Sequence, residues 1–115
     1  MERSVFQYLR YANPPESLFP RRIRTALVYT MNVDAEVAQA MGISAHADKT
    51  RFFVEMVFGP CEVLNSYDTL QFDDYDKYDN SRFDPIAKMK RNREVFPQDE
   101  AMAMDLGRRL LNPIQ

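Results

Sequence analysis

A chain of 115 residues, 45% of them hydrophobic and 28% charged, has the size and composition of one globular domain spanning residues 1–115. Its formal net charge of -2 provides no overall attraction to nucleic acid or to a membrane surface, so neither is expected as a partner. No segment approaches the roughly 18 consecutive apolar residues that indicate a membrane helix. The early charged residues Glu2 and Arg3 argue against a signal peptide.

The cysteine and glycine content excludes several kinds of cofactor site. The lone Cys61 cannot form an internal disulfide, and a single thiol holds neither a metal ion nor an iron–sulfur cluster. We therefore expect a reducing, cytoplasmic environment. The three glycines, Gly42, Gly59 and Gly107, lie far apart, so the chain has no glycine-rich loop of the kind that cradles a phosphate group.

The first expected elements are a short amphipathic helix over residues 3–11 and a strand over residues 23–30. The two prolines within 13–15 end the helix, because proline cannot continue it and restricts the residue before it. The strand carries a largely apolar run at 26–29 that does not alternate with polar residues. This pattern is typical of a strand covered on both faces, as in a parallel sheet.

Two helices are expected between this strand and the next. Asp34 is placed to cap a helix over 35–41, which the following glycine closes. A second helix is expected over 48–58, with either Ser44 or Asp48 as its cap.

A second strand, of mixed polarity, is expected at 61–70 after the stop signal at 59–60. Its alternating polar and apolar side chains suit an edge strand. Helices between the strands predict parallel pairing with a right-handed crossover. Two parallel strands are rarely stable alone, and one edge of strand 23–30 would remain bare. We therefore expect a homo-oligomer, or a requirement for a complementary N-terminal half.

Residues 71–84 form the most polar segment and are expected to be a loop, which we call the acidic–tyrosine loop. Its acidic and tyrosine residues are Asp73, Asp74, Tyr75, Asp76, Tyr78 and Asp79. Their spacing does not match a calcium-binding loop. Aromatic rings beside charges are common at protein interfaces, so a docking surface is one interpretation, and a solvated loop packed by its own rings is the other.

The remaining elements are a short helix over 85–93 and a final helix from Pro97 to the stop at 112–113. The first of these helices carries a basic run, which we expect to form a solvated face. Together with basic residues near strand 23–30, it is alternatively a patch for a phosphate-bearing ligand such as NADPH. The residues concerned are Lys88, Lys90, Arg91 and Arg93, with Arg21, Arg22 and Arg24.

Three segments carry a resemblance to a known family. They are residues 1–3 with the aromatic-rich helix after them, the Arg-Thr-Ala-Leu-Val-Tyr-Thr-Met-Asn segment at 24–32, and the Phe-Pro-Gln-Asp segment at 96–99 with Ala103 and 106–110. With the order of elements, these segments resemble the C-terminal half of the flavodoxin-like NAD(P)H-dependent FMN reductases, especially the group that contains the iron–sulfur flavoproteins.

The resemblance implies a partial flavodoxin-like α/β fold. The family sheet has five parallel strands in the order 2-1-3-4-5 with helices on both faces, and this chain would supply strands four and five. Self-association or an N-terminal half would complete the sheet. Met1 is then either an internal methionine of a longer reading frame or the start of a shortened relative.

The resemblance also implies FMN as the cofactor. Among the family's flavin contacts, the loop after the fourth strand matches Thr30, Met31 and Asn32, and Val33 follows them in the same loop. Their hydroxyl, thioether and amide suit the apolar face and the polar edge of a flavin ring. The family's phosphate loop and the cysteine cluster of its iron–sulfur members lie upstream and have no counterpart here.

The sequence therefore leaves functions of different classes open. The first is the C-terminal part of an FMN-dependent NAD(P)H oxidoreductase, contributing the flavin-ring side of the site without a catalytic acid or base of its own. The alternative is a non-catalytic α/β association module that acts through the open sheet edge and the acidic–tyrosine loop. A third is an oligomer that rebuilds a flavin pocket from two copies. The choice between NADH and NADPH and the electron acceptor stay open.

Overall fold

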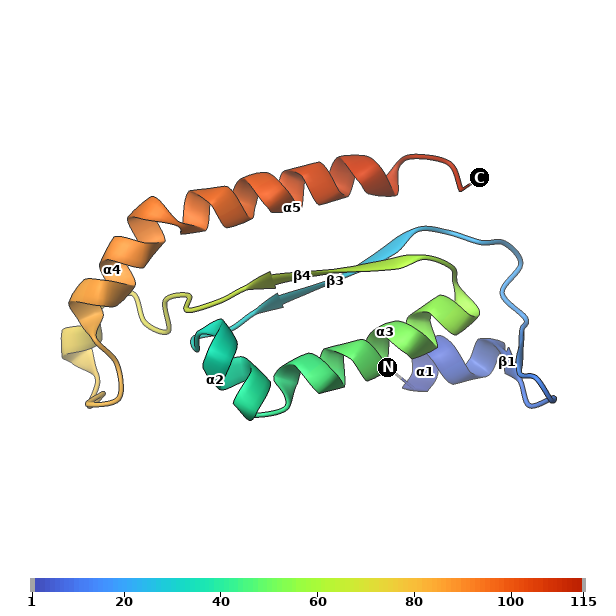
Figure 1. The fold of residues 1–115 in the computed structure, drawn as a ribbon, viewed down its shortest axis with the longest axis horizontal. Helices are drawn as coiled ribbons and strands as arrows, with labels where there is room; N and C mark the ends of the chain where they lie inside the picture. Colours follow the sequence, from blue (N-terminus) through green and yellow to red (C-terminus); the bar gives the residue numbers. More distant parts are fainter. Residues whose placement is uncertain (1, 115) are drawn as a thin grey trace.

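A parallel sheet lies between two long helices in the computed structural model, which describes residues 2–114 (Figure 1). The strands are β3 (Thr25–Thr30) and β4 (Cys61–Ser66), paired in register from the first residue of each to the last. Helix α3 (Ile43–Val57) covers one face, and helix α5 (Phe96–Leu110) covers the other. The predicted mixed α/β class and the parallel pairing are confirmed. Across residues 2–114, every helix is too short or too polar to cross a membrane.

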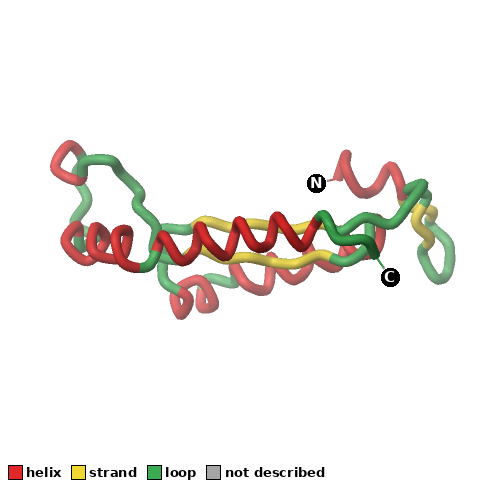
Figure 2. The backbone as a smooth tube through the Cα atoms, turned by 90° about the horizontal axis from the view of Figure 1, so that it is seen from above, coloured by secondary structure: helices red, strands yellow, loops and turns green. Residues whose placement is uncertain are grey.

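Strand β3 is less covered than its apolar sequence predicts. Val28 is 56% exposed, and Thr30 is exposed as well, so the expectation of burial on both faces is wrong for this strand. The reason is the width of the sheet, which has only two strands in the described residues. Figure 2 shows α5 running lengthwise above the pair of strands. One helix on each face covers the middle of such a narrow sheet and leaves its margins open.

Two aspartates begin the helices that flank the carboxyl ends of the strands. Asp34 caps α2 (Ala35–Ala40), as predicted, and Asp84 caps α4 (Pro85–Glu94). Each carboxylate accepts a hydrogen bond from the backbone N–H three residues later, at 2.8 and 3.1 Å. These bonds satisfy backbone donors that have no partner in the first turn of a helix.

Helix α3 begins earlier than predicted, at Ile43, and neither Ser44 nor Asp48 caps it. Gly42 adopts a left-handed conformation with φ of 77°, and its carbonyl accepts the N–H of His46 at 3.0 Å. This glycine therefore both ends α2 and starts α3. The sequence pattern assigned it only the first of these roles.

The expected helix over 3–11 is correct only at its beginning. Helix α1 (Glu2–Val5) passes into a 3-10 turn, η1 (Phe6–Tyr8), and then into β1 (Leu9–Arg10). Strand β1 pairs antiparallel with β2 (Glu16–Ser17) across the proline-containing turn. The helix has therefore ended well before the prolines, contrary to the prediction, and the prolines lie in the turn of a hairpin.

The main apolar cluster lies between this N-terminal segment and the end of α3. Its buried members are Val5, Leu9 and Val57. The Ser17 hydroxyl ties the hairpin to α3 by donating to the Val57 carbonyl at 2.6 Å. The rings and the thioether packed around the cluster are Phe6, Tyr8, Phe19, Phe53, Met56 and Phe58.

The described chain is elongated, with extents of 53 × 28 × 23 Å and a radius of gyration of 17.8 Å. A compact domain of this length has a radius of gyration of about 13 Å. The shape follows from the separation of the apolar cluster from the carboxyl ends of the strands, which lie at opposite ends of α3 (Figure 1). The sheet therefore receives little support beyond its two covering helices.

The acidic–tyrosine loop is a loop, as predicted, with a 3-10 turn η2 (Tyr75–Lys77) inside it. Its own rings hold it together. Phe72 stacks on Tyr78 with ring centroids 4.3 Å apart, and Tyr75 is buried. Asp73, Asp76 and Asp79 are exposed, and Asp74 is half-buried. The loop is thus a solvated segment packed by its rings, one of the two interpretations of its sequence.

We expect opposite effects from alanine at two glycines. A Cβ atom at Gly59, whose φ is 128°, would lie 2.7 Å from the Ile23 carbonyl oxygen, whereas a Cβ atom at Gly107 in α5 meets nothing within 4 Å. Gly59→Ala should lower the free energy of unfolding by about 2 kcal/mol. Gly107→Ala should raise it by about 0.5–1 kcal/mol because alanine favours the helix interior. Urea denaturation measures both, and equal effects would contradict the packing of the turn before β4.

Candidate functional site at the carboxyl ends of the strands

The loops that follow the two strands are joined to each other by backbone hydrogen bonds. The Met31 N–H donates to the Ser66 carbonyl at 3.0 Å. In return, the N–H and the hydroxyl of Thr69 donate to the Met31 carbonyl at 2.9 and 3.1 Å. The Asp68 N–H donates to the Val33 carbonyl at 2.8 Å. The carboxyl ends of the parallel strands therefore form one connected platform.

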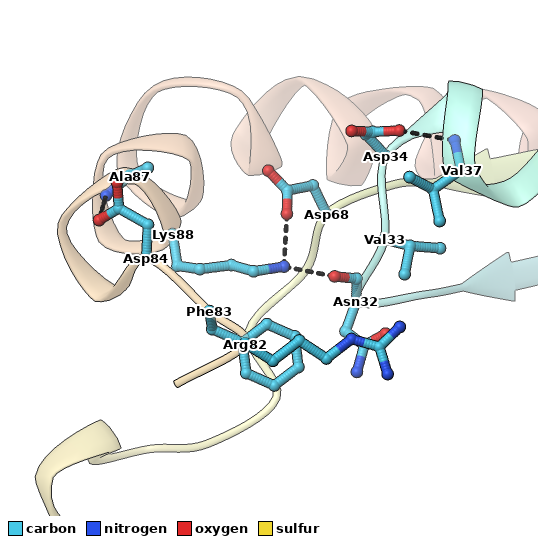
Figure 3. Close-up of a pocket in the computed structure, with 10 residues that line it drawn as sticks. All are labelled: Asn32, Val33, Asp34, Val37, Asp68, Arg82, Phe83, Asp84, Ala87 and Lys88. Carbon is cyan, nitrogen blue, oxygen red and sulfur yellow. Dashed lines mark hydrogen bonds and ion pairs between the residues drawn. The ribbon is translucent and has the colours of Figure 1, made fainter. Parts of the chain in front are cut away.

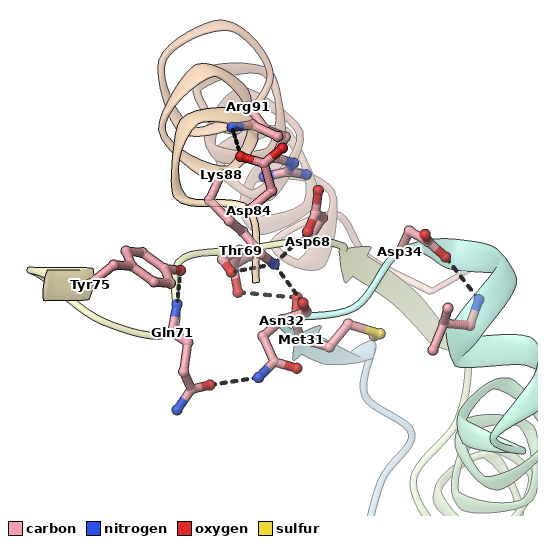
Figure 4. A network of polar contacts seen from close by, with 12 residues as sticks. Met31, Asn32, Asp34, Asp68, Thr69, Gln71, Tyr75, Asp84, Lys88 and Arg91 are labelled. Atoms are coloured by element: carbon pink, nitrogen blue, oxygen red, sulfur yellow. Dashed lines mark hydrogen bonds and ion pairs between the residues drawn. The ribbon is translucent and has the colours of Figure 1, made fainter. Parts of the chain in front are cut away.

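Lys88 of α4 fastens this platform to the helix (Figure 4). Its side chain is almost fully buried, and its Nζ donates to the carbonyls of Asn32 at 2.5 Å and Thr69 at 3.3 Å. It also forms an ion pair with Asp68, whose backbone has a positive φ of 54°. These three oxygens come from both loops, so one ammonium group orders the end of the sheet.

A pocket of about 270 Å³ opens beside this ammonium group (Figure 3). The loop after β3, the start of α2 and the start of α4 form its wall. Its lining residues are Asn32, Val33, Asp34, Val37, Asp68, Arg82, Phe83, Asp84, Ala87 and Lys88.

Most charged groups around the pocket are already engaged within the chain. Asp34 and Asp84 accept helix N–H groups, while Asp68 and Lys88 pair with each other. Arg82 differs, because no acidic side chain in residues 2–114 forms an ion pair with it. The pocket thus offers one cationic group to a ligand, on a wall that also includes apolar side chains.

Asn32 presents the second polar group of the pocket. Its Nδ2 donates to Gln71 Oε1 at 2.7 Å, which fixes the amide and leaves the side-chain oxygen as an acceptor. Phe83 also lines the pocket, and the centroid of its ring lies 5.2 Å from the Lys88 Nζ. An aromatic face, an amide oxygen and a guanidinium suit a planar ligand with a polar edge.

The three residues predicted to contact a flavin do not line one cavity. Asn32 lines the pocket. Thr30 lies on the α5 face of the sheet, beside Phe96, at a separate hollow of about 120 Å³. Met31 is half-buried, and its backbone bonds to the loop after β4. Contact with a flavin at all three positions remains a prediction.

The sequence did not reveal that two residues of the basic run point inward. Lys88 and Arg91 lie three residues apart on α4, so they share one face, whereas Lys90 and Arg93 are exposed. The expectation of a solvated face is therefore wrong for the first pair. The spacing of the four residues places the two pairs on different faces of the helix, and this was the available signal in the sequence. Because all four residues are basic, their charge does not show which face is buried.

Arg91 pairs with a buried carboxylate next to the platform. The Arg91 Nη2 and the Ser66 hydroxyl donate to Asp99 Oδ2 at 2.5 and 2.6 Å, which joins α4, β4 and α5. Burial raises the pKa of Asp99, but the hydrogen bonds from Ser66 and Arg91 and the charge of Arg91 outweigh it, so this pKa lies below its ordinary value of 3.8. Asp99 therefore remains ionised at neutral pH.

The size and chemistry of the pocket fit a ring system better than a whole nucleotide. Ligand pockets usually measure about 300–1,000 Å³, and this one, at about 270 Å³, falls just below that range. Among residues 2–114, no group of three or more His, Cys, Asp or Glu side chains is placed to hold a metal ion. The fit to FMN is therefore limited to the flavin ring, and the glycine content provides no cradle for its phosphate.

The fold and the site together define a small mixed α/β protein with a polar pocket at the carboxyl ends of its parallel strands. Comparison with models of known protein families, with curated proteins and with solved structures found no match.

Proposed function

We propose that the chain is the C-terminal part of a flavodoxin-like, FMN-dependent NAD(P)H oxidoreductase and contributes the flavin-ring side of its site. The observation that carries this proposal is the pocket beside Asn32 at the carboxyl ends of β3 and β4. Open parallel α/β sheets bind their ligands at this edge.

The residues of the pocket have complementary roles in this proposal. The Asn32 amide oxygen accepts a hydrogen bond from the polar edge of the flavin, and Arg82 faces its carbonyl groups. Phe83 and Val33 exclude water from the ring. Lys88 keeps its own hydrogen bonds within the chain and holds the Asn32 backbone in place, so its role is positioning.

FMN, when bound, supplies the redox chemistry and takes up two electrons from NAD(P)H. The chain then needs no general acid or base of its own. The phosphate group of FMN requires residues outside the described site, from an N-terminal half or from a second copy. Strands added at the exposed edge of β3 would place such residues beside the pocket.

Equilibrium titration with FMN, followed by flavin fluorescence, tests the proposal. We expect saturable quenching at micromolar to tens of micromolar FMN. Asn32→Ala and Arg82→Ala should each weaken binding about tenfold, which corresponds to the loss of about 1.4 kcal/mol. Lys77→Ala is the matched control, because this exposed lysine lies outside the pocket lining. Absence of binding at millimolar FMN would overturn the proposal.

The exposed β3 edge favours a second candidate function, the non-catalytic association module. Val28 is a large apolar side chain that is 56% exposed on a strand. An apolar strand with an open edge is a template for pairing with another chain. In this candidate the acidic–tyrosine loop supplies the polar part of the docking surface. A chain that fails to bind FMN but forms a defined complex would support it.

A further inference from the structure

The alternating direction of the peptide groups along β3 shows which of its N–H and C=O groups lie on the outer edge of the strand. The N–H of Thr25 and the N–H of Met31 both donate toward β4, at 2.9 and 3.0 Å. Successive residues of a strand direct their peptide groups to opposite sides. The N–H and C=O groups of Ala26, Val28 and Thr30 therefore point away from β4, toward the open edge.

The outer edge of β4 is better protected than that of β3. The Cys61 N–H at its start donates to the Glu55 carboxylate at 3.4 Å, and each described β4 side chain is buried or half-buried. On β3, Val28 and Thr30 are exposed. They also line the apolar hollow of about 120 Å³ under α5. The β3 edge is thus the side of the sheet where both hydrogen bonds and apolar cover are incomplete.

We infer that β3 pairs with the β3 strand of a second copy of this chain, antiparallel, around a two-fold axis at Val28. Val28 then lies opposite the partner's Val28, and Ala26 lies opposite the partner's Thr30. Antiparallel residues that face each other in this way exchange both of their backbone hydrogen bonds. Among the two-fold symmetric registers, this one gives a partner to every outward N–H and C=O of the three residues.

Charge complementarity favours the antiparallel arrangement over a parallel one. The chain enters β3 through the exposed Arg21 and Arg22 and leaves it toward Asp34 and Glu36. In the antiparallel register, the basic entry of one copy lies beside the acidic exit of the other, and the symmetry repeats this pairing. Parallel, in-register pairing would set the arginines of both copies against each other, which is unfavourable.

The same symmetry completes the cover of the sheet. A two-fold axis perpendicular to the sheet keeps both α5 helices on one face. The two Val28 side chains then meet on that face, next to the hollow under α5. The resulting four strands exceed the minimum of about three that usually gives an independently stable sheet. This inference concerns the open edge alone and does not depend on FMN binding.

Sedimentation velocity and site-directed cross-linking, both without FMN, test the dimer and its register. Cys61 is buried and is replaced by alanine in every cross-linking variant. Facing residues in this register have Cα atoms about 5.5 Å apart, within the range of a disulfide. Val28→Cys should therefore form a covalent dimer on mild oxidation.

Ala26→Cys is the matched control on the same edge and the same face. Its symmetry mate lies about 13 Å away along the strands, too far for a disulfide. Val28→Cys should cross-link at least tenfold more than Ala26→Cys, while a mixture of Ala26→Cys and Thr30→Cys chains should form mixed dimers. A monomer at 100 micromolar, or equal cross-linking of the two single variants, would overturn the inference.

Discussion

Replacing Lys88 with methionine should lower the free energy of unfolding by about 3–5 kcal/mol, the range for breaking a buried, hydrogen-bonded charge pair. The ammonium group bonds to the carbonyls of Asn32 and Thr69 and to the carboxylate of Asp68. Methionine leaves these acceptors without a donor next to an apolar side chain. Because small domains have a total stability of only about 5–15 kcal/mol, the variant should be marginally folded. Urea denaturation followed by circular dichroism measures the change.

Two variants separate the contributions within this cluster. Lys90→Met changes an exposed lysine of the same helix and should alter stability by less than about 0.5 kcal/mol. Asp68→Asn removes the charge of a carboxylate that is 39% exposed and can be hydrated, so it should cost less than Lys88→Met. If Lys90→Met lowers the free energy of unfolding as much as Lys88→Met does, the buried, hydrogen-bonded position of Lys88 is contradicted.

Replacing Asp99 with asparagine should lower the free energy of unfolding by about 3 kcal/mol at pH 7. The carboxylate receives hydrogen bonds from Ser66 and Arg91, and another guanidinium nitrogen of Arg91, Nη1, is buried without a hydrogen-bond partner. Without the negative charge, the guanidinium is left buried and uncompensated. Glu100→Gln, at the next position of α5, alters an exposed carboxylate and serves as the control.

The effect of Asp99→Asn should depend on pH in a defined direction. The pKa of Asp99 is lowered in the folded state, so its stabilisation is fully present above the ordinary aspartate pKa of 3.8. The stabilisation is lost as the pH falls through the lowered pKa. The difference in unfolding free energy between the parent chain and the variant should therefore shrink below about pH 4. A constant difference down to pH 2 would contradict this assignment.

Local patterns in the sequence were sufficient for most of the elements. The apolar run predicted β3, Asp34 predicted the start of α2, and Pro97 predicted the first turn of α5. These features depend on residues that are close in the chain, where backbone capping and proline restriction act. The parallel pairing followed from the helices between the two strands.

The errors in the prediction concern features that depend on distant residues. The exposure of Val28 reflects the number of strands in the sheet, which a single apolar run does not indicate. The burial of Lys88 and Arg91 depends on oxygens from Asn32 and Asp99, far away in the chain or on another helix. A basic residue on a polar helix is solvated in most proteins, so the sequence offered little reason to place these two inside.

The residues of the candidate site also include both predicted and missed ones. Asn32 was singled out through the resemblance to the FMN reductases, whose loop after the fourth strand it matches, and it lines the pocket. Arg82 and Phe83 were not singled out, because they belong to a loop that the sequence does not connect to β3. Their position beside Asn32 depends on the turn from β4 into α4, which the buried Lys88 holds in place.

The two proposals concern two different parts of β3. The flavin proposal concerns the carboxyl end of the strand, where the pocket lies. The dimer concerns its outer edge, centred on Val28. Loss of the dimer in a chain that still binds FMN, or the reverse, would separate them.

In the proposed function, the flavin ring binds beside Asn32 at the carboxyl ends of the strands. Two-dimensional amide NMR of the labelled chain during titration with FMN locates the bound ligand residue by residue. We predict saturable shifts confined to the amides of residues 30–34 and 82–84, with the apolar cluster around Val57 unchanged. Unchanged spectra at millimolar FMN, or shifts centred away from these two loops, would contradict the flavin proposal.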